Sequence, residues 1–297
     1  MAFVASQYEP LFPTVFFQPV RMNINVIRGH YAALMMSCDI FRWSSYVFAR
    51  VLYAAKQGGE HAYLERFVPL LDQLGRICVV LNGKDNLNSE IGRLSSAIEL
   101  SLLKNMTSGV RSSYAMLRGA APVLTRIAFL DPSLRPSYPC PNGISLTSAL
   151  ASPWIEVGRF VMTDIISSLV FGIPPLIKYD TRDSLVAGRS EYGYHMEWLY
   201  GCPARFAFSI EQTNRWRADR PSGHPPWREI ADDTWAWQAR CDHGPELESA
   251  GLVGRLAVQE GWRHAVLIYL YMSSSTGSVF SVTNKPTSDN YHFAVDG

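Results

Sequence analysis

Few residues in this chain stand at spacings that support catalysis or metal binding. The five cysteines form neither a C-x-x-C pair nor a compact disulfide framework, because they are spread widely as Cys38, Cys78, Cys140, Cys202 and Cys241. Cys241 and His243 are close enough to share a metal ion. A metal site needs more ligands than this pair supplies, so exposed or capping roles are favoured for both.

A carboxylate pair, Asp232 and Asp233, is the nearest match to a magnesium site of the terpene cyclase type. Such a site needs further acidic residues one helical turn away to hold magnesium against a diphosphate, and these are missing. The chain also lacks a glycine-rich phosphate loop, a G-x-S-x-G elbow and an H-E-x-x-H motif. We therefore expect no metal and no cofactor, and an enzyme such as a terpene cyclase is disfavoured.

Composition indicates an ordinary globular protein of 297 residues, with 47% hydrophobic and 18% charged residues. The net charge of +1 gives no overall attraction to nucleic acid or acidic membranes. An odd number of cysteines and no secretory signal predict reduced, intracellular thiols. The most apolar window, Phe160 to Ile177, contains Asp164, Pro174 and Pro175. These residues argue against a membrane-spanning segment.

Helical periodicity dominates the chain. Apolar residues recur at steps of three and four, which places them on one face of a helix. Pro69 and Pro122 should each kink a helix or start a new one, and Asn86 is placed to cap one. The spacing predicts an all-α fold, an irregular array of about nine or ten helices. The clearest apolar stripes run through Ile40–Val51, Leu64–Leu81, Leu87–Leu102 and Val110–Ala128.

Three segments depart from this pattern. Residues 1–20 are rich in proline and aromatic residues and read as an extended lead-in to a helical domain over 21–272. Residues 131–153 form a proline-rich loop inside that domain. Residues 273–297 are rich in Ser, Thr, Asn and Gly and predict a disordered or aberrant, non-helical C-terminal tail. Just before it, Ala265–Met272 is apolar all round, so we expect it to be buried on every side.

Three stretches of the chain together resemble a known family. They are FVMTDIISSLVFGIPPLIKYDT (Phe160–Thr181), WLYGCPARFAFSIEQTNRWR (Trp198–Arg217) and RLAVQEGWRHAVLIYLYM (Arg255–Met272). As an ordered set they resemble the fungal-specific transcription factor domain, the helical regulatory region that follows the binuclear zinc-cluster DNA-binding domain. The resemblance extends from about Tyr8 to Met272.

The resemblance implies a regulatory, non-enzymatic domain in the nucleus that receives a signal from a protein partner or a small-molecule effector. The chain departs from the family in lacking the six-cysteine zinc cluster, so no direct DNA contact is expected from its own residues. Regions of this family usually continue with further helices, and a truncated gene model is the simplest explanation of the Ser/Thr-rich tail. A stand-alone helical binder of an apolar small molecule is the alternative.

Most motif residues are expected to be structural: Asp164, Tyr179, Asp180, Trp198, Gln259, Glu260, Trp262 and Arg263. A buried carboxylate needs a partner, so Asp164 and Glu260 are predicted to pair with arginines such as Arg159, Arg205 or Arg263. A weaker prediction places an effector pocket among four aromatic residues, namely Trp198, Phe206, Trp216 and Trp262.

Two sequence patterns are compatible with association, but core packing is favoured for both. The stripe Leu64–Leu81 is a candidate for homodimerisation, although Pro69 interrupts it and its short length favours core packing. Tryptophans and arginines also alternate in the second half of the chain. Such a pattern can stack single-stranded bases, but the near-zero net charge favours core packing with arginines stacked on rings.

Overall fold

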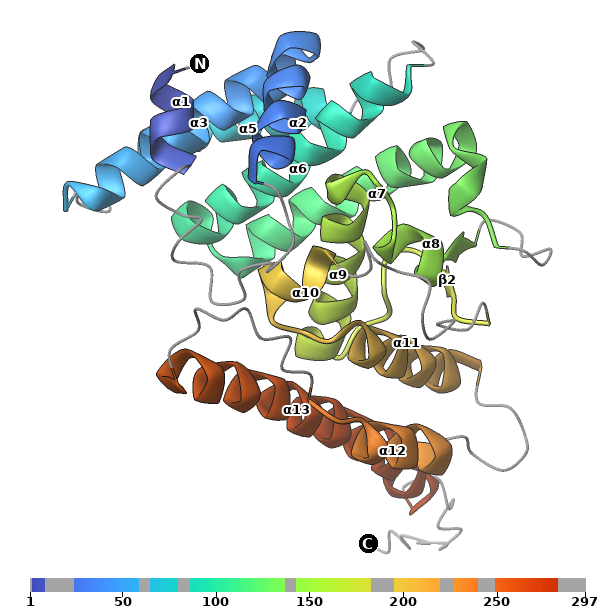
Figure 1. Ribbon diagram of the computed structural model, residues 1–297. Coiled ribbons are helices and arrows are strands. Elements are labelled where there is room, and N and C mark those ends of the chain that lie inside the picture. The colour runs from blue at the N-terminus through green and yellow to red at the C-terminus, as the bar shows by residue number, and fades with distance from the viewer. Residues whose placement is uncertain are drawn as a thin grey trace, which may run out of the picture.

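The computed structural model describes residues 2–8, 24–58, 65–79, 86–136, 143–182, 195–219, 227–239 and 249–282. These residues form an irregular array of packed helices, so the all-α prediction is confirmed (Figure 1). Within them the strands are limited to β1 (Ile144–Ser145) and β2 (Tyr179–Asp180), which pair in parallel. None of the described helices is both long and apolar enough to cross a lipid bilayer.

The first half of the chain surrounds helix α6 (Leu87–Ser108). Helices α3, α5 and α7 pack along α6, and α1 and α2 pack on α3. Most of α6 is buried, which its many small and apolar side chains allow. The other bounds are α1 (Ala2–Tyr8), α2 (Ile24–Ser37), α3 (Asp39–Lys56), α5 (Val68–Val79) and α7 (Val110–Leu130).

The second half is arranged around helix α9 (Ile155–Phe171). This helix contacts α6 and α7 on one side and α8, α10 and α11 on the other. The long helix α13 packs on α11 and α12 and lies at the lower edge of the array in Figure 1. The remaining bounds are η2 (Pro132–Leu134), α8 (Leu146–Leu150), α10 (His195–Tyr200), α11 (Ala204–Asp219), α12 (Trp227–Ala236) and α13 (Ser249–Val282).

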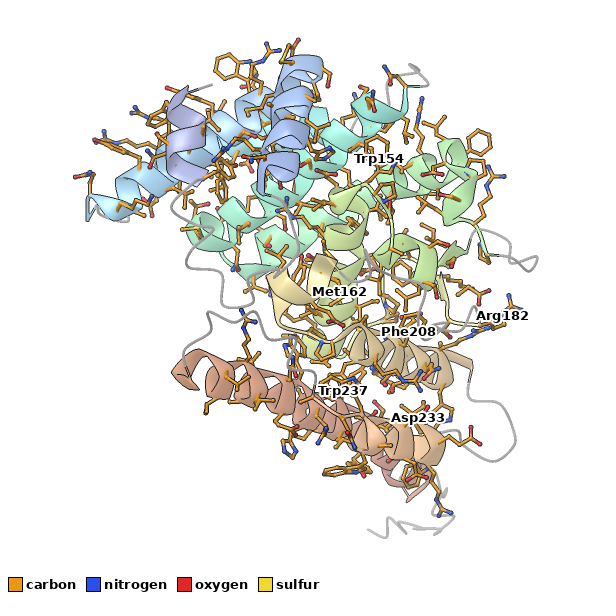
Figure 2. All side chains as sticks on the ribbon, in the orientation of Figure 1. Trp154, Met162, Arg182, Phe208, Asp233 and Trp237 are labelled. Carbon is orange, nitrogen blue, oxygen red and sulfur yellow. The ribbon has the colours of Figure 1, made fainter. Side chains whose placement is uncertain are left out.

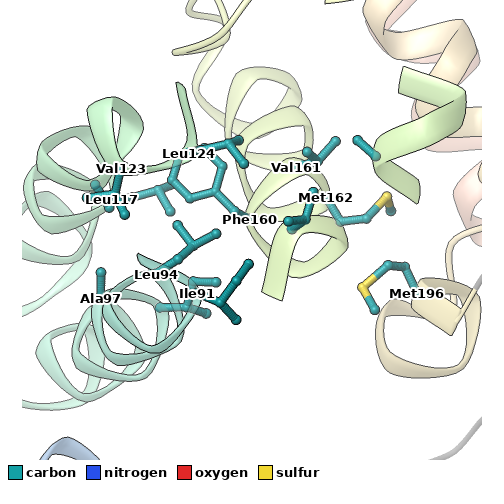
Figure 3. Close-up of a cluster of buried hydrophobic side chains, with 14 of the residues drawn as sticks. Ile91, Leu94, Ala97, Leu117, Val123, Leu124, Phe160, Val161, Met162 and Met196 are labelled. Atoms are coloured by element: carbon teal, nitrogen blue, oxygen red, sulfur yellow. The ribbon is translucent and has the colours of Figure 1, made fainter. Parts of the chain in front are cut away.

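The main hydrophobic core lies where α6, α7 and α9 meet. Phe160 of α9 is fully buried between Ile91 and Leu94 of α6 and Leu117 and Leu124 of α7 (Figure 3). These partners belong to the two apolar stripes predicted over Leu87–Leu102 and Val110–Ala128. The stripes are therefore confirmed as core faces except at Leu102 and Val110, which are exposed. Burial of side chains this large contributes about 1.5–3 kcal/mol each.

Local signals for helix starts are also confirmed. The side chain of Asn86 accepts a hydrogen bond of 3.0 Å from the backbone N–H of Asn88 and caps α6. Pro69 is the second residue of α5, where its missing N–H costs nothing and a new helix begins. Pro122 instead lies inside α7, which continues through it to Leu130.

Two predictions near proline-rich sequence were wrong in part. Residues 2–8 form helix α1 rather than an extended lead-in, because the prolines start only at Pro10 and buried Val4 anchors the helix on α3. The predicted loop 131–153 contains α8, whose start is capped by the Ser145 hydroxyl, 3.2 Å from the Ser148 N–H. With these short helices, the described residues contain slightly more helices than the expected number of about nine or ten. Residues 9–23 and 137–142 lie outside the described residues.

Two predictions at the other end were also wrong in part. Helix α13 continues past Met272 to Val282, because no proline interrupts the chain there before Pro286; residues 283–297 lie outside the described part. Ala265–Met272 is not buried on every side. Leu270 is fully buried against neighbouring helices, whereas Ile268 is 59% and Met272 68% exposed. Helix α13 lies at the edge of the array, so its neighbours cover only one face.

A close helix approach at Gly92 generates the first prediction. A Cβ atom at this position of α6 would lie 2.7 Å from both Cβ and Sγ of Cys38, the residue that precedes α3. We expect Gly92→Ala to lower the free energy of unfolding by about 1–3 kcal/mol, because the added methyl overpacks the contact. Chemical denaturation measures the loss.

Gly261 supplies the matched control. It is a helical glycine in α13 with no atom within 4 Å of its would-be Cβ. Gly261→Ala should raise stability by up to about 1 kcal/mol through helix propensity alone. If both substitutions stabilise the protein, the close approach of α6 to Cys38 is contradicted.

Candidate functional site

Helix α9 carries an unusual number of polar groups into the interior. Glu156, Asp164 and Ser168 are buried, and Arg159 and Thr163 are largely covered. Helix α9 contacts several other helices, so its fully buried polar groups need partners within the fold. They fall into two clusters and one open groove.

The first cluster, here the Arg159 cluster, joins α9 to α2. Arg159 Nη1 donates to the Tyr31 hydroxyl oxygen at 2.9 Å. The carboxylate of Glu156 lies 2.9 and 3.1 Å from Nε2 of His30. This hydrogen bond raises the pKa of His30, which favours an imidazolium–carboxylate pair.

Glu99 of α6 extends this cluster to α1 and α3. Its carboxylate accepts hydrogen bonds from the hydroxyls of Tyr8 at 3.1 Å and Ser45 at 3.2 Å. Burial raises the pKa of Glu99 to about 7, partly opposed by the positive charge of Arg159. The cluster therefore fastens the N-terminal helices to α9 and holds an exchangeable proton near neutral pH.

The second cluster, here the motif seam, begins at Asp164. Its carboxylate accepts hydrogen bonds from the backbone N–H groups of Leu176 (2.9 and 3.0 Å) and Ile177 (3.3 Å). The hydroxyl of Tyr179 donates to the same carboxylate at 2.8 Å. Asp164 thus fixes the turn that follows α9 onto the helix itself.

The seam continues through α11 to α13. The amide of Asn214 donates to the Ser168 hydroxyl at 2.8 Å, and its oxygen accepts from the Tyr269 hydroxyl. Arg217 donates to Tyr269 at 2.6 Å and to the carbonyl of Gly172 at 2.9 Å. All three stretches that carry the family resemblance therefore meet in one hydrogen-bonded seam.

Two carboxyl groups in the seam have shifted acidity. Burial raises the pKa of Asp164 to about 6, against the opposing effect of its three donors. Burial raises the pKa of Glu211 to about 8, with hydrogen bonds from Asn214 and the Tyr179 backbone opposing it and the charge of Asp164 adding to it. At neutral pH the seam therefore keeps a proton on Glu211.

The predicted arginine partner of Asp164 was wrong. Its partners in the described part of the chain are backbone N–H groups and a phenol, which satisfy a carboxylate without a second buried charge. Glu260 does pair with Arg263, at 2.9 Å, but its side chain is 41% exposed. Arg205 pairs instead with Asp233 of α12, whose side chain is 58% exposed (Asp233 is labelled in Figure 2).

The residues considered for metal chemistry are dispersed or outside the described part. Among the described residues, no three His, Cys, Asp or Glu side chains converge. Cys241 and His243 fall outside those residues. Cys38, Cys78 and Cys202 are free, buried thiols, and burial raises the pKa of Cys78 to about 12. A thiol whose pKa is raised in this way is a poor nucleophile at neutral pH.

A groove of about 250 Å³ opens between α6, α7, α9 and α10, and we name it the α7–α9 groove. Thr163 and Tyr200 lie at one part of its lining, with their hydroxyl oxygens 2.7 Å apart. Ser101 and Ser113 form a second hydroxyl pair, at 2.9 Å. The other lining residues are Asn105, Val110, Tyr114, Leu117, Ile166, Ser167, Val170 and Phe171.

Of the four aromatic residues predicted to form an effector pocket, the structure describes the side chains of Phe206, Trp216 and Trp262. Phe206 is fully buried, with its ring 4.7 Å from that of Trp237. Trp262 packs against the core and its Nε1 donates to the carbonyl of Tyr200 at 3.2 Å. Trp216 is partly buried on α11, and the side chain of Trp198 lies outside the described part. Neither described cavity is lined by Phe206, Trp216 or Trp262, so that pocket stays a prediction.

Sequence reasoning missed the groove. Its signal was the placement of hydroxyl residues such as Ser101, Thr163 and Ser167 within otherwise apolar helices. Two apolar residues of the predicted stripes, Leu102 and Val110, are exposed at 46% and 51%. Val110 belongs to the groove, so its exposure is a further sign that this face of α7 is not fully packed.

The seam predicts a large cost for Asp164→Ala. The substitution leaves two backbone N–H groups and the Tyr179 hydroxyl without their acceptor. We expect a loss of about 3 kcal/mol in the free energy of unfolding, since each buried group without a partner costs about 1–3 kcal/mol. The control is Glu260→Gln, which should cost less than about 1 kcal/mol because its ion pair is half-exposed. Equal losses in urea denaturation would contradict the central role of Asp164.

The raised pKa values predict a specific pH dependence. Glu211 is protonated in the folded state up to about pH 8, whereas the unfolded chain releases this proton near the ordinary value of 4.5. The contribution of Glu211 to the free energy of unfolding is fully present below about pH 4.5 and is lost as the pH rises towards 8. Asp164, Glu99 and His30 also have raised pKa values and act in the same direction.

Glu211→Gln tests this expectation, because glutamine has the shape of the protonated acid and cannot ionise. Wild type should lose stability between pH 5 and pH 8. The variant should be more stable than wild type at pH 8 by at least about 1 kcal/mol, with a flatter profile in thermal denaturation. Parallel profiles for the two proteins would show that Glu211 does not carry the shifted proton.

Comparison with known proteins adds no further assignment. The chain matches none of the protein-family models, curated proteins or solved structures with which it was compared. The geometry of the seam, the Arg159 cluster and the α7–α9 groove is therefore the structural basis for a functional proposal. The resemblance of the three motif stretches is the sequence basis.

Proposed function

We propose that this chain is a regulatory, non-enzymatic helical domain of a fungal transcription regulator, which receives a signal from a partner or an effector. The observation that carries the proposal is the motif seam. The three stretches that resemble the family are separate in sequence, yet Asp164, Asn214 and Tyr269 belong to one hydrogen-bonded unit, in which Tyr179 and Glu211 link Asp164 to Asn214.

The chemistry of the seam supports a structural rather than a catalytic role for the motif residues. Asp164 uses its oxygens to hold a turn, and Arg217 bridges Tyr269 and the end of α9. A catalytic group needs access to a reacting atom, whereas these groups are occupied by one another. The domain therefore acts in this proposal through binding and shape rather than through turnover.

An exposed apolar surface on α12 and α13 supports a protein partner, including a second copy of the chain. Trp235 is 51%, Ile268 59% and Met272 68% exposed. Exposed apolar groups gathered on neighbouring elements are typical of interaction sites. The same proposal implies a nuclear location and leaves DNA contact to another module.

A stand-alone binder of an apolar small molecule is the second candidate. The α7–α9 groove favours it, because its lining combines apolar side chains with a few hydroxyl groups. Ligand sites generally have this composition. The two candidates differ in whether the chain affects transcription.

A reporter assay separates them. The full chain is fused to a heterologous DNA-binding domain in a fungal reporter strain, and transcription is compared with the DNA-binding domain alone at equal protein level. We expect the fusion to change transcription. Asn214→Leu, which breaks the seam between α9 and α13, should remove the effect, and Glu260→Gln should keep it.

Equal transcription from the fusion and from the DNA-binding domain alone would contradict the regulatory proposal. An effect that survives Asn214→Leu unchanged would contradict the role of the seam in it. A fluorescent fusion of the full chain, found outside the nucleus in the same strain, would count against the proposed location.

A further inference from the structure

We infer that the α7–α9 groove binds a small, neutral, mostly apolar molecule that carries a hydrogen-bond donor, such as a phenol or an alcohol. The inference starts from the juxtaposition of two hydroxyl pairs with apolar walls from α7 and α9. The role of this molecule as an effector rests on the proposed function. Its binding to the groove does not depend on that function.

The lining selects for a neutral ligand. None of the groove residues is acidic or basic, apart from the phenols of Tyr114 and Tyr200. Burial raises the pKa of both phenols, so both are uncharged at neutral pH. The neighbouring cavity between α5, α6 and α7 is different, because Asp72, Arg76 and Lys104 line it. A charged ligand would lose water in the α7–α9 groove without gaining a countercharge.

The walls favour an aromatic or alicyclic body. The rings of Tyr114 and Phe171 meet edge to face with centroids 5.7 Å apart. Phe171 is 41% and Val170 62% exposed, and both belong to the lining. A ligand that covers these apolar atoms removes them from water, which is favourable in proportion to the area covered.

The hydroxyl groups favour a ligand that donates a hydrogen bond. Thr163 Oγ1 lies 2.7 Å from both the Arg159 carbonyl and the Tyr200 hydroxyl, which is itself 3.0 Å from that carbonyl. Each hydroxyl has one proton and two lone pairs, and the carbonyl has no proton. Both protons are therefore used inside this triangle, and lone pairs remain for a donor from the ligand.

The serine pair repeats the same arrangement. Ser101 Oγ lies 3.0 Å from the Ser113 carbonyl and 2.9 Å from the Ser113 hydroxyl. Its proton is used on the carbonyl, and the Ser113 proton can point to Ser101. The groove thus presents hydroxyl oxygens as acceptors in two places.

The size of the groove limits the ligand to a small molecule. Its volume of about 250 Å³ lies just below the range of about 300–1,000 Å³ that is usual for ligand sites. One or two rings fit such a space, whereas a docked helix does not. The lining comes from both halves of the fold, since α6 and α7 supply one wall and α9 and α10 the other.

Three related probes test the inference with the purified full chain. They are 1-naphthol, naphthalene and 1-naphthoate, and titration calorimetry measures their dissociation constants. We expect saturable binding of 1-naphthol, about fivefold weaker binding of naphthalene, which lacks one hydrogen bond, and at least about tenfold weaker binding of the anion.

Variants locate the site. Thr163→Val combined with Tyr200→Phe should weaken 1-naphthol about fivefold and leave naphthalene unchanged, which also verifies that the variant is folded. Ser167→Leu fills the groove and should abolish binding of both. Ala115→Leu is the control, because Ala115 lies on α7 but lines the neighbouring cavity, and it should have no effect.

The inference is overturned if 1-naphthol does not bind saturably, if 1-naphthoate binds as tightly, or if the groove variants bind 1-naphthol like wild type. A transcriptional effect without naphthol binding would refute ligand binding in the α7–α9 groove and would leave the proposed function unaffected. Naphthol binding with a silent reporter would support the groove and refute the regulatory role.

Discussion

The interior of this protein is organised by the need to satisfy polar groups that α9 carries into the core. Asp164 is the clearest example, since its carboxylate is almost fully buried and holds three donors. Burying a carboxylate is costly unless its hydrogen bonds are replaced. The turn after α9 and the short pair of strands follow from that requirement, because both place donors where Asp164 needs them.

The same constraint links the halves of the molecule. Glu156 and Arg159 on the first turns of α9 reach His30 and Tyr31 of α2, while Ser168 near its end reaches Asn214 of α11. Phe160 lies between these polar regions and packs on α6 and α7 (Figure 3). Polar partners thus fix the direction and register of α9, and apolar contacts supply most of the favourable burial. Thr163, on the partly open side, leaves room for the groove.

Much of the fold could be predicted from the spacing of apolar residues, because that spacing depends only on helical geometry. The stripe containing Ile91 and Leu94 is buried as expected, and Asn86 caps its helix. What could not be predicted depends on neighbours. Ile268 follows the same apolar pattern as buried Leu270 but is exposed, since only one side of α13 is covered. The backbone partners of Asp164 were missed for a related reason. Almost every residue carries a backbone N–H group, so residue type does not show which of them will donate to a buried carboxylate.

Helix α13 has a consequence for how the chain reaches its native state. Tyr269 closes the motif seam from a position close to the end of the described residues, long after α9 has been synthesised. Synthesis proceeds from the N-terminus, so the contacts between the seam and α13 can form only after α13 has emerged. The N-terminal helices can pack around α6 during translation. The C-terminal end of α9, with Ser168, stays solvated until α13 emerges. Until α13 has emerged, nascent chains are therefore vulnerable to chaperone capture or proteolysis at α9.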